Sequence, residues 1–144
     1  MQKKILSKSD NQTRQIAKKF ASNLKGGEVI ALVGDLGAGK TTFSKGVASA
    51  LGIDGNITSP TFVLVKQYKI NQNKQKIKNF IHADCYRFAS ANDALSIGLD
   101  EYLGNNETVC IIEWPEIIKD ILPNETIWIN INHATNDNRE IIFN

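Results

Sequence analysis

The sequence predicts an α/β fold, in which a sheet with a parallel core and antiparallel additions is flanked by helices. Three observations predict it. A β-branched apolar run at residues 28–33 is typical of a buried strand, and a glycine-rich loop and a helical apolar pattern at 41–51 follow it. Four apolar residues in a row, 109–112, indicate a second central strand. Alternating segments at 61–83 and 126–143 predict two antiparallel hairpins. Helices between strands favour a parallel core.

The remaining elements are shorter. Residues 3–7 could form a strand, and Ser9 with Gln12 resembles a capping box. It opens an amphipathic helix that is expected to pack outside the first core strand and to end at Gly26-Gly27. Ser90 is expected to cap a short helix that Gly98 ends, with another helical turn at 99–103.

Length and composition exclude several classes of protein. The chain has 144 residues, which fit a single domain over 1–144, and its net charge of +2 predicts no strong attraction to nucleic acid or membranes. No run of about 18 apolar residues exists, so no membrane span is expected, and the N-terminus lacks the apolar region of a secretory signal. Cys85 and Cys110 are expected as buried free thiols, which suits a cytoplasmic protein.

The loop after the first core strand fits the phosphate-binding pattern G-x-x-x-x-G-K-[ST], from Gly34 to Thr41. Its glycines let successive backbone N–H groups point at phosphate oxygens, and the helix N-terminus adds partial positive charge. Lys40 is expected to reach the β- and γ-phosphates, and the Thr41 hydroxyl to bind Mg²⁺. The predicted nucleotide-binding residues of this loop are Asp35, Leu36, Gly37, Ala38, Gly39, Lys40, Thr41 and Thr42. The sequence therefore predicts a nucleoside triphosphate site.

Such a site also needs an acid at the carboxyl end of a neighbouring strand and a group that orients the attacking water. Asp84 and Glu113 each follow an apolar run, so both are candidates for catalysis and for binding Mg²⁺; which one does which stays open. His82 is either a core or hairpin residue or a catalyst. Trp114 is either core filling or a lid over the nucleotide, and its residue type alone favours the core.

Four blocks of sequence together resemble the bacterial TsaE (YjeE) family of ATPases, over residues 28 to 116. They are the phosphate loop Gly34-Asp35-Leu36-Gly37-Ala38-Gly39-Lys40-Thr41-Thr42, then Ser59-Pro60-Thr61-Phe62, His82-Ala83-Asp84-Cys85-Tyr86-Arg87 and Ile112-Glu113-Trp114-Pro115-Glu116. The loop alone occurs in many families, whereas the combination is specific.

The resemblance implies an accessory role in forming N6-threonylcarbamoyladenosine at position 37 of tRNAs that read codons beginning with A. The protein would bind and hydrolyse Mg-ATP to support repeated turnover of a complex with the TsaD and TsaB proteins, and would meet tRNA only through that complex. It also implies that Lys40 and Thr41 serve phosphate and magnesium, that Asp84 and Glu113 are acidic site residues, and that Trp114 is an aromatic needed for function. Residues 59–61 would be a nucleotide-responsive switch.

Three other functions are compatible with a phosphate loop. A GTPase would carry Asp-x-x-Gly and Asn-Lys-x-Asp, and neither occurs, so ATP should be preferred to GTP. A small-molecule kinase would need an arginine-bearing lid, and the chain has three arginines. Arg14 and Arg139 have no obvious path to the phosphates, while Arg87 could reach them or could equally face a partner. A nucleotide-gated binding module with slow or no turnover stays open. Hydrolysis is expected to be slow alone and faster once partners order residues 59–61.

Overall fold

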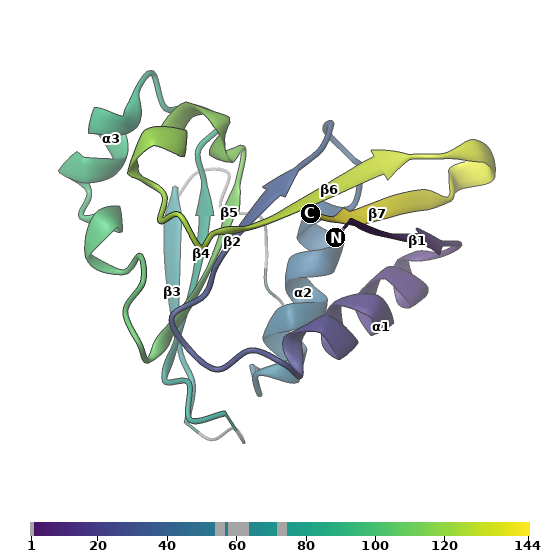
Figure 1. Cartoon of the computed structure of the whole chain (residues 1–144), viewed down its shortest axis with the longest axis horizontal. Coiled ribbons are helices and arrows are strands. Elements are labelled where there is room, and N and C mark those ends of the chain that lie inside the picture. The colour runs from purple at the N-terminus through teal and green to yellow at the C-terminus, as the bar shows by residue number, and fades with distance from the viewer. Residues whose placement is uncertain (1, 54–56, 58–63, 72–74) are drawn as a thin grey trace.

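A computed structural model describes residues 2–53, 57, 64–71 and 75–144 of the chain (Figure 1). These residues contain one seven-stranded sheet in the order β1-β7-β6-β2-β5-β4-β3. The strands are β1 (Lys3–Ser7), β2 (Val29–Val33), β3 (Val65–Lys69), β4 (Asn79–Asp84), β5 (Thr108–Glu113), β6 (Ile127–His133) and β7 (Arg139–Phe143). The four central strands β6, β2, β5 and β4 are parallel, while β1, β7 and β3 pair antiparallel at the two edges. The predicted α/β fold with a parallel core and antiparallel additions is confirmed.

Both predicted hairpins are present. β3 pairs antiparallel with β4, and β6 with β7. The start of the first hairpin as predicted, residues 61–63, lies outside the described residues. The predicted first strand is β1, which pairs with β7 at the edge of the sheet.

Helices cover both faces of the sheet (Figure 1). α1 (Asp10–Ala21) and α2 (Lys40–Ala50) lie on one face; α3 (Ala91–Ser96) and the 3-10 helices η1 (Leu99–Glu101) and η2 (Pro115–Ile121) lie on the other, and η3 (Thr135–Asp137) joins β6 to β7. Successive residues of β5 alternate between the two apolar cores: Val109 and Ile111 face α1 and α2, and Cys110 and Ile112 face the other layer. The central strands are therefore buried on both sides, as their unbroken apolar runs predict.

The first helix begins as predicted. The Ser9 hydroxyl accepts from the Gln12 N–H at 3.0 Å, and the Gln12 side chain accepts from the Lys8 N–H at 2.6 Å, one residue earlier than in a standard capping box. The helix ends at Ala21, so the predicted end at the two glycines is wrong. The Ser22 hydroxyl bonds back to the Lys19 carbonyl at 2.6 Å, and tight turns carry the chain onward from there.

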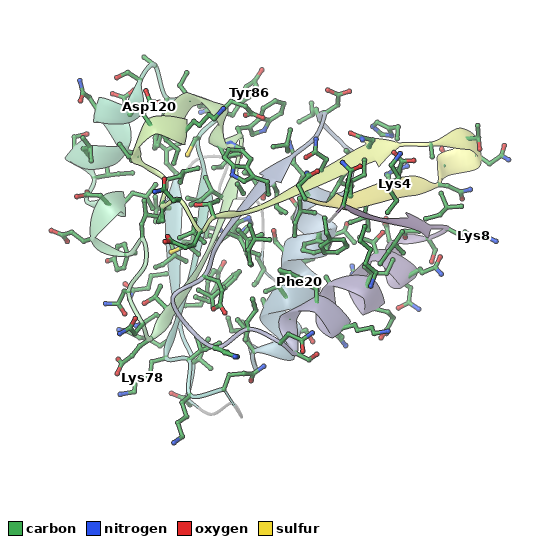
Figure 2. All side chains as sticks on the ribbon, in the orientation of Figure 1. Lys4, Lys8, Phe20, Lys78, Tyr86 and Asp120 are labelled. Atoms are coloured by element: carbon green, nitrogen blue, oxygen red, sulfur yellow. The ribbon has the colours of Figure 1, made fainter. Side chains whose placement is uncertain are left out.

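The position predicted for this helix is also only partly right, because it packs chiefly on α2 rather than directly on the first core strand. Phe20 points from α1 toward the interior, whereas Lys8 and Lys78 point into solvent (Figure 2). The Phe20 ring lies 5.9 Å from that of Phe43 in α2 and 5.5 Å from that of Phe143 in β7. This aromatic cluster joins the two helices to the edge of the sheet.

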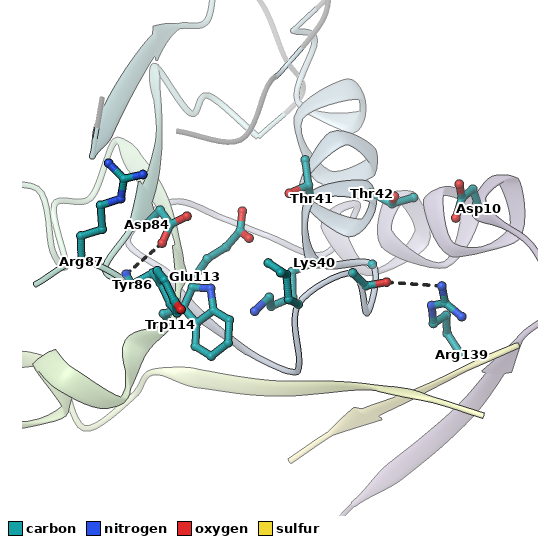
Figure 3. Close-up of a pocket in the computed structure, with 13 residues that line it drawn as sticks. Asp10, Lys40, Thr41, Thr42, Asp84, Tyr86, Arg87, Glu113, Trp114 and Arg139 are labelled. Atoms are coloured by element: carbon teal, nitrogen blue, oxygen red, sulfur yellow. Dashed lines mark hydrogen bonds between the residues drawn. The ribbon is translucent and has the colours of Figure 1, made fainter. Parts of the chain in front are cut away.

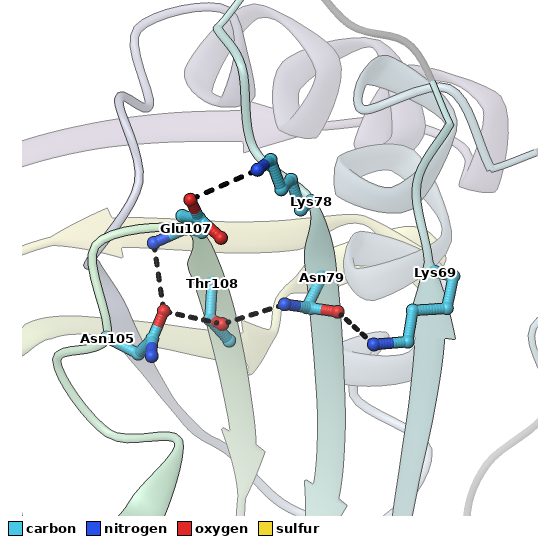
Figure 4. Close-up of polar contacts among 6 residues, drawn as sticks. All are labelled: Lys69, Lys78, Asn79, Asn105, Glu107 and Thr108. Carbon is cyan, nitrogen blue, oxygen red and sulfur yellow. Dashed lines mark hydrogen bonds and ion pairs between the residues drawn. The ribbon is translucent and has the colours of Figure 1, made fainter.

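The amino-terminal ends of β4 and β5 carry a polar network (Figure 4). Asn79 accepts from the Lys69 ammonium at 3.0 Å and donates to the Thr108 hydroxyl at 3.4 Å, and Lys78 pairs with Glu107 at 3.2 Å. Lys69 and Lys78 are both exposed, so each ammonium pairs with a polar side chain at the surface of the sheet. At the opposite ends of the strands, the sheet leads into the candidate site.

Cys85 and Cys110 are both buried and free, as predicted. In the described part of the chain, no helix is long and apolar enough to cross a bilayer.

Candidate nucleotide-binding site

A pocket of about 420 Å³ opens at the carboxyl ends of the parallel strands (Figure 3). Its lining comes from the phosphate loop, the ends of β4 and β5, the start of α1 and the start of β7: Asp10, Leu36, Gly37, Gly39, Lys40, Thr41, Thr42, Asp84, Tyr86, Arg87, Glu113, Trp114 and Arg139. This edge of a parallel sheet is where ligands gather in open α/β folds.

The phosphate loop joins β2 to α2 and depends on its glycines. Gly37 and Gly39 have φ of 76° and 111°, a region that favours glycine. Gly34 is required for space, because a Cβ there would lie 2.3 Å from the Ile131 carbonyl oxygen of β6. Two predicted loop residues do not line the pocket: the Asp35 carbonyl accepts from the Ala38 N–H at 3.0 Å, and the Ala38 side chain is buried in the core.

Lys40, the first residue of α2, is held in the pocket by two contacts. Its ammonium donates to the Gly34 carbonyl at 2.6 Å and lies 3.6 Å from the centroid of the Trp114 ring. Burial lowers the pKa of Lys40, and the negative charges of Glu113 and Asp84 oppose that shift. A buried ammonium at the first position of a helix is well suited to an anionic ligand.

Asp84 and Glu113 face each other because their strands are adjacent. They are partners in the parallel register of β4 and β5, which end at the same level. Asp84 is half-buried and accepts from the Tyr86 N–H at 2.9 Å. Burial raises the pKa of Asp84, while this hydrogen bond opposes the shift. The sheet thus brings together the two carboxylates that the sequence separates by 29 positions of chain.

His82 is a core residue in contact with the site. It is fully buried in β4, and its Nε2 lies 2.5 Å from a Glu113 carboxylate oxygen. Its Nδ1 is buried without a partner among the described residues. Glu113 itself is 4% exposed and lines the pocket, and one of its carboxylate oxygens is held by His82.

The donors present fit Mg²⁺ bound together with a phosphate chain. The Thr41 hydroxyl and the carboxylates of Asp84 and Glu113 are hard oxygen ligands, which this ion prefers. Among the described residues, no group of three or more His, Cys, Asp or Glu side chains could hold a metal ion by itself. An ion that takes its other ligands from phosphate and water suits such a site.

Trp114 lies in the wall of the pocket and also packs against the apolar core on the side of α3, so both positions expected for it, core and site, apply. Its ring covers the Lys40 ammonium and lies 5.0 Å from the Tyr86 ring. Its backbone is left-handed, with φ of 55° and ψ of 54°, a conformation that is costly for an aromatic residue. Strained conformations of this kind cluster at functional sites.

Arg139 was expected to have no obvious path to the phosphates, but it lines the pocket and contacts the phosphate loop. Its guanidinium donates to the Gly37 carbonyl at 3.3 Å and to the Asp137 carbonyl at 2.9 Å. β7 runs antiparallel to β6, so its first residue pairs with His133 at the carboxyl end of β6, beside the loop.

Asp10 also lines the pocket, although it was not among the site residues predicted from the sequence. No local sequence signal marks it, since it enters the pocket through the packing of α1 on α2.

Comparisons with known proteins give one consistent family. The family model described as "Threonylcarbamoyl adenosine biosynthesis protein TsaE" matches residues 7–141. A protein of Bacillus subtilis named "tRNA threonylcarbamoyladenosine biosynthesis protein TsaE" is 43% identical over 132 residues, 92% of this chain and 78% of the relative. A protein of the same name from Treponema pallidum is 38% identical over 138 residues, 96% of this chain and 97% of the relative.

The fold is also similar to a solved structure. The crystal structure of Bacillus subtilis YdiB superimposes with a TM-score of 0.79 at 40% sequence identity, covering 99% of this chain and 84% of that one. With a family model that matches nearly the whole chain and relatives of this identity, the chain belongs to the TsaE family.

Proposed function

We propose that this chain is a cytoplasmic accessory ATPase in the formation of N6-threonylcarbamoyladenosine at position 37 of tRNAs that read codons beginning with A. It binds and hydrolyses Mg-ATP to support repeated turnover of a TsaD–TsaB complex, and it meets tRNA only through that complex. The observation that carries the ATPase assignment is one pocket in which Lys40 and Thr41 of the phosphate loop face the paired carboxylates Asp84 and Glu113. Family membership supports the pathway.

The role of each residue in this proposal follows from its position in the pocket. Lys40 and the loop N–H groups bind the β- and γ-phosphates, and the Thr41 hydroxyl and Asp84 bind Mg²⁺. Mg²⁺, when bound, neutralises charge that develops on the transferring phosphoryl group. Glu113, held by His82, orients the attacking water and accepts its proton. Binding of ATP requires the Lys40 ammonium to exchange its hydrogen bond with the Gly34 carbonyl for bonds with phosphate oxygens. The Trp114 ring shields one side of that ammonium from water.

The rivals fit the pocket less well. A kinase would need a site for a second substrate and an arginine-bearing lid, and the sequence has only three arginines. A binding module without turnover would not need two acidic side chains side by side at the γ-phosphate end. The pairing of Asp84 with Glu113 therefore favours hydrolysis.

Titration of ATP against the Lys40→Ala variant tests the site. We expect productive ATP binding to be lost, because the phosphates lose the fixed cation closest to them in the described site. Lys45→Ala is the matched control, since Lys45 lies on the same helix but does not line the pocket. Unchanged ATP affinity in Lys40→Ala would refute the assignment of the phosphate loop.

A further inference from the structure

A second cavity lies at the end of β6 opposite the nucleotide pocket. It has a volume of about 570 Å³ and is bounded by the second half of α1 on one side and by β1, β7 and β6 on the other. Figure 1 shows α1 passing beside β1. Ile127, the first residue of β6, and Phe143, the last of β7, line this cavity, whereas the nucleotide pocket opens at the carboxyl ends of the parallel strands. The two cavities share no lining residue.

We propose that this cavity, the α1–β1 groove, binds an acidic amphipathic helix of a partner protein. The apolar stripe of that helix enters the groove, and its carboxylates meet Lys3 and Lys19 at the rim. The apolar floor, the unpaired charges of the rim and the open side of the groove support this assignment. It is independent of nucleotide binding, because no residue that lines the groove has a part in the proposed ATPase site.

The floor of the groove is apolar and already formed. Its side chains are all half-buried: Ile5, Ile16, Phe20, Ile127 and Phe143. The rings of Phe20 in α1 and Phe143 in β7 are 5.5 Å apart, so an aromatic contact fixes the two walls relative to each other. Half-burial leaves part of the apolar surface of each residue in contact with water, and covering that surface with apolar side chains of a partner is favourable.

The rim of the groove is basic. Lys3 lies on the β1 side and Lys19 on the α1 side, and both are exposed. Neither ammonium has a hydrogen-bond or ion-pair partner among the described residues. The third polar residue of the lining is Asn23, and none of the described residues that line the groove is acidic. A carboxylate on the occupant would therefore meet unneutralised positive charge on both sides of the groove, which favours an acidic partner over a neutral or basic one.

The open side of the groove favours a protein helix over other occupants of similar chemistry. A fatty acid also joins an apolar chain to a carboxylate, but small ligands bind in cavities that enclose about 70–90% of their surface, and no side chain of this floor is fully buried. A helix covers the opening with its own polar face, while apolar side chains three and four positions apart enter the groove. A second copy of this chain fits less well, since a symmetric pair would set Lys3 and Lys19 of one copy against the same residues of the other.

Binding of a synthetic helix tests the inference. The probe is a capped peptide of about five helical turns, built from glutamate with leucine at every third or fourth position and labelled for fluorescence anisotropy. The wild type should bind this peptide, and more weakly as the salt concentration rises. It should bind the matching peptide of lysine and leucine at least about tenfold more weakly.

Two substitutions separate the rim from the floor. Lys19→Glu should weaken binding of the glutamate peptide roughly fivefold, because it replaces an attraction at the rim with a repulsion. Lys18→Glu is the matched control: it makes the same change of charge at the neighbouring position of α1, but Lys18 does not line the groove, so the affinity should change less than about twofold. Ile16→Ser should weaken binding roughly fivefold through lost apolar contact and leave the dependence on salt unchanged.

The inference is overturned if the wild type binds neither peptide, binds both equally, or loses as much affinity in Lys18→Glu as in Lys19→Glu. If the peptide does not bind, but laurate binding or self-association of the chain is present and is abolished by Ile16→Ser, the groove belongs to a lipid or to a second copy, which overturns the inference as well. Thermal unfolding checks that each variant is folded, and Ile16→Ala replaces Ile16→Ser if that variant is not.

Discussion

Asp84 and Glu113 are partners in one register, yet their surroundings differ enough to predict different roles. Glu113 is nearly fully buried and held by His82, which fixes its direction as a water-orienting group requires. Asp84 is half-buried at the pocket rim, where it can approach a hydrated ion. The first prediction separates the two.

Glu113→Gln should keep Mg-ATP binding largely intact and slow hydrolysis by roughly 10²–10⁴-fold, the usual effect of losing a positioned acid–base group. Asp84→Asn should instead weaken magnesium-dependent ATP binding, because it removes a ligand of the metal. Titration of Mg²⁺ against each variant, together with single-turnover hydrolysis, measures both effects. Glu116→Gln is the control, because Glu116 is exposed and does not line the pocket. A loss of metal affinity confined to the Glu113 variant would exchange the two roles.

Asp84 also makes stability depend on pH. Burial raises its pKa above 3.8, so the folded chain binds this proton more tightly than the unfolded chain. The free energy of unfolding therefore falls as the pH rises from about 3.8 through the raised pKa of Asp84. Above that window Asp84 is ionised and its full destabilisation of the fold is reached. Without nucleotide and metal, Asp84→Asn should unfold a few degrees above the wild type near pH 7, with the difference shrinking toward about pH 4.

Thermal unfolding of the wild type and of Asp84→Asn across this pH range measures the difference in melting temperature. Other titrating groups are the same in both proteins, so their contributions to this difference cancel. A difference in melting temperature that stays constant with pH would mean that ionisation of Asp84 does not destabilise the fold.

At the scale of elements, the site depends on how closely α1 packs on α2. A Cβ at Gly46 would lie 2.6 Å from the Ala17 Cβ and 2.6 Å from the Arg14 carbonyl oxygen. Alanine favours an isolated helix over glycine by roughly 1 kcal/mol, but here it would force the helices apart. We expect Gly46→Ala to destabilise the fold by about 1–3 kcal/mol, the usual range for overpacking.

Chemical denaturation measures that change. Ser49→Ala is the control, because it raises helix propensity on the exposed face of the same helix. If Gly46→Ala and Ser49→Ala both stabilise the protein, the close contact between the helices does not limit its stability. Since Asp10 enters the pocket through this packing, Gly46→Ala should also weaken ATP binding.

At the scale of the molecule, the part of the chain that the structure describes leaves the pocket open on one side. The apolar side chains of Leu36 and Tyr86 stand at its mouth with exposed fractions of 84% and 67%. Hydrolysis in an open site lacks the exclusion of water that raises rates in related chemistry, and an arginine added by a partner would be worth roughly 10³–10⁵-fold. We expect slow ATP turnover by the isolated chain and at least about tenfold faster turnover with TsaD and TsaB proteins.

Steady-state assays with purified components measure that stimulation, and Lys40→Ala in the same mixture gives the background from the partners. Equal rates for the isolated chain and the complex would contradict the proposal. The segment that these partners are expected to order, residues 59–61, lies outside the described residues.

The sequence alone determined the elements and much of the site. The strand, glycine loop and helix around Lys40 were predictable because backbone geometry and apolar periodicity act over a few residues. Asp84 and Glu113 were predictable as candidates because each ends an apolar strand, and parallel strands share their carboxyl edge. The end of α1 was not, because hydrogen bonds by Ser22 stopped the helix before its glycines.

Only the tertiary structure decided which of these residues meet. The register of β4 and β5 sets Asp84 against Glu113 and puts His82 beside it, and the left-handed backbone of Trp114 turns its ring over Lys40. Arg139 reaches Gly37 across 102 positions of chain because β7 returns antiparallel along β6. Such contacts depend on strand order and helix packing, which sum over many weak interactions along the whole chain, so no local pattern encodes them.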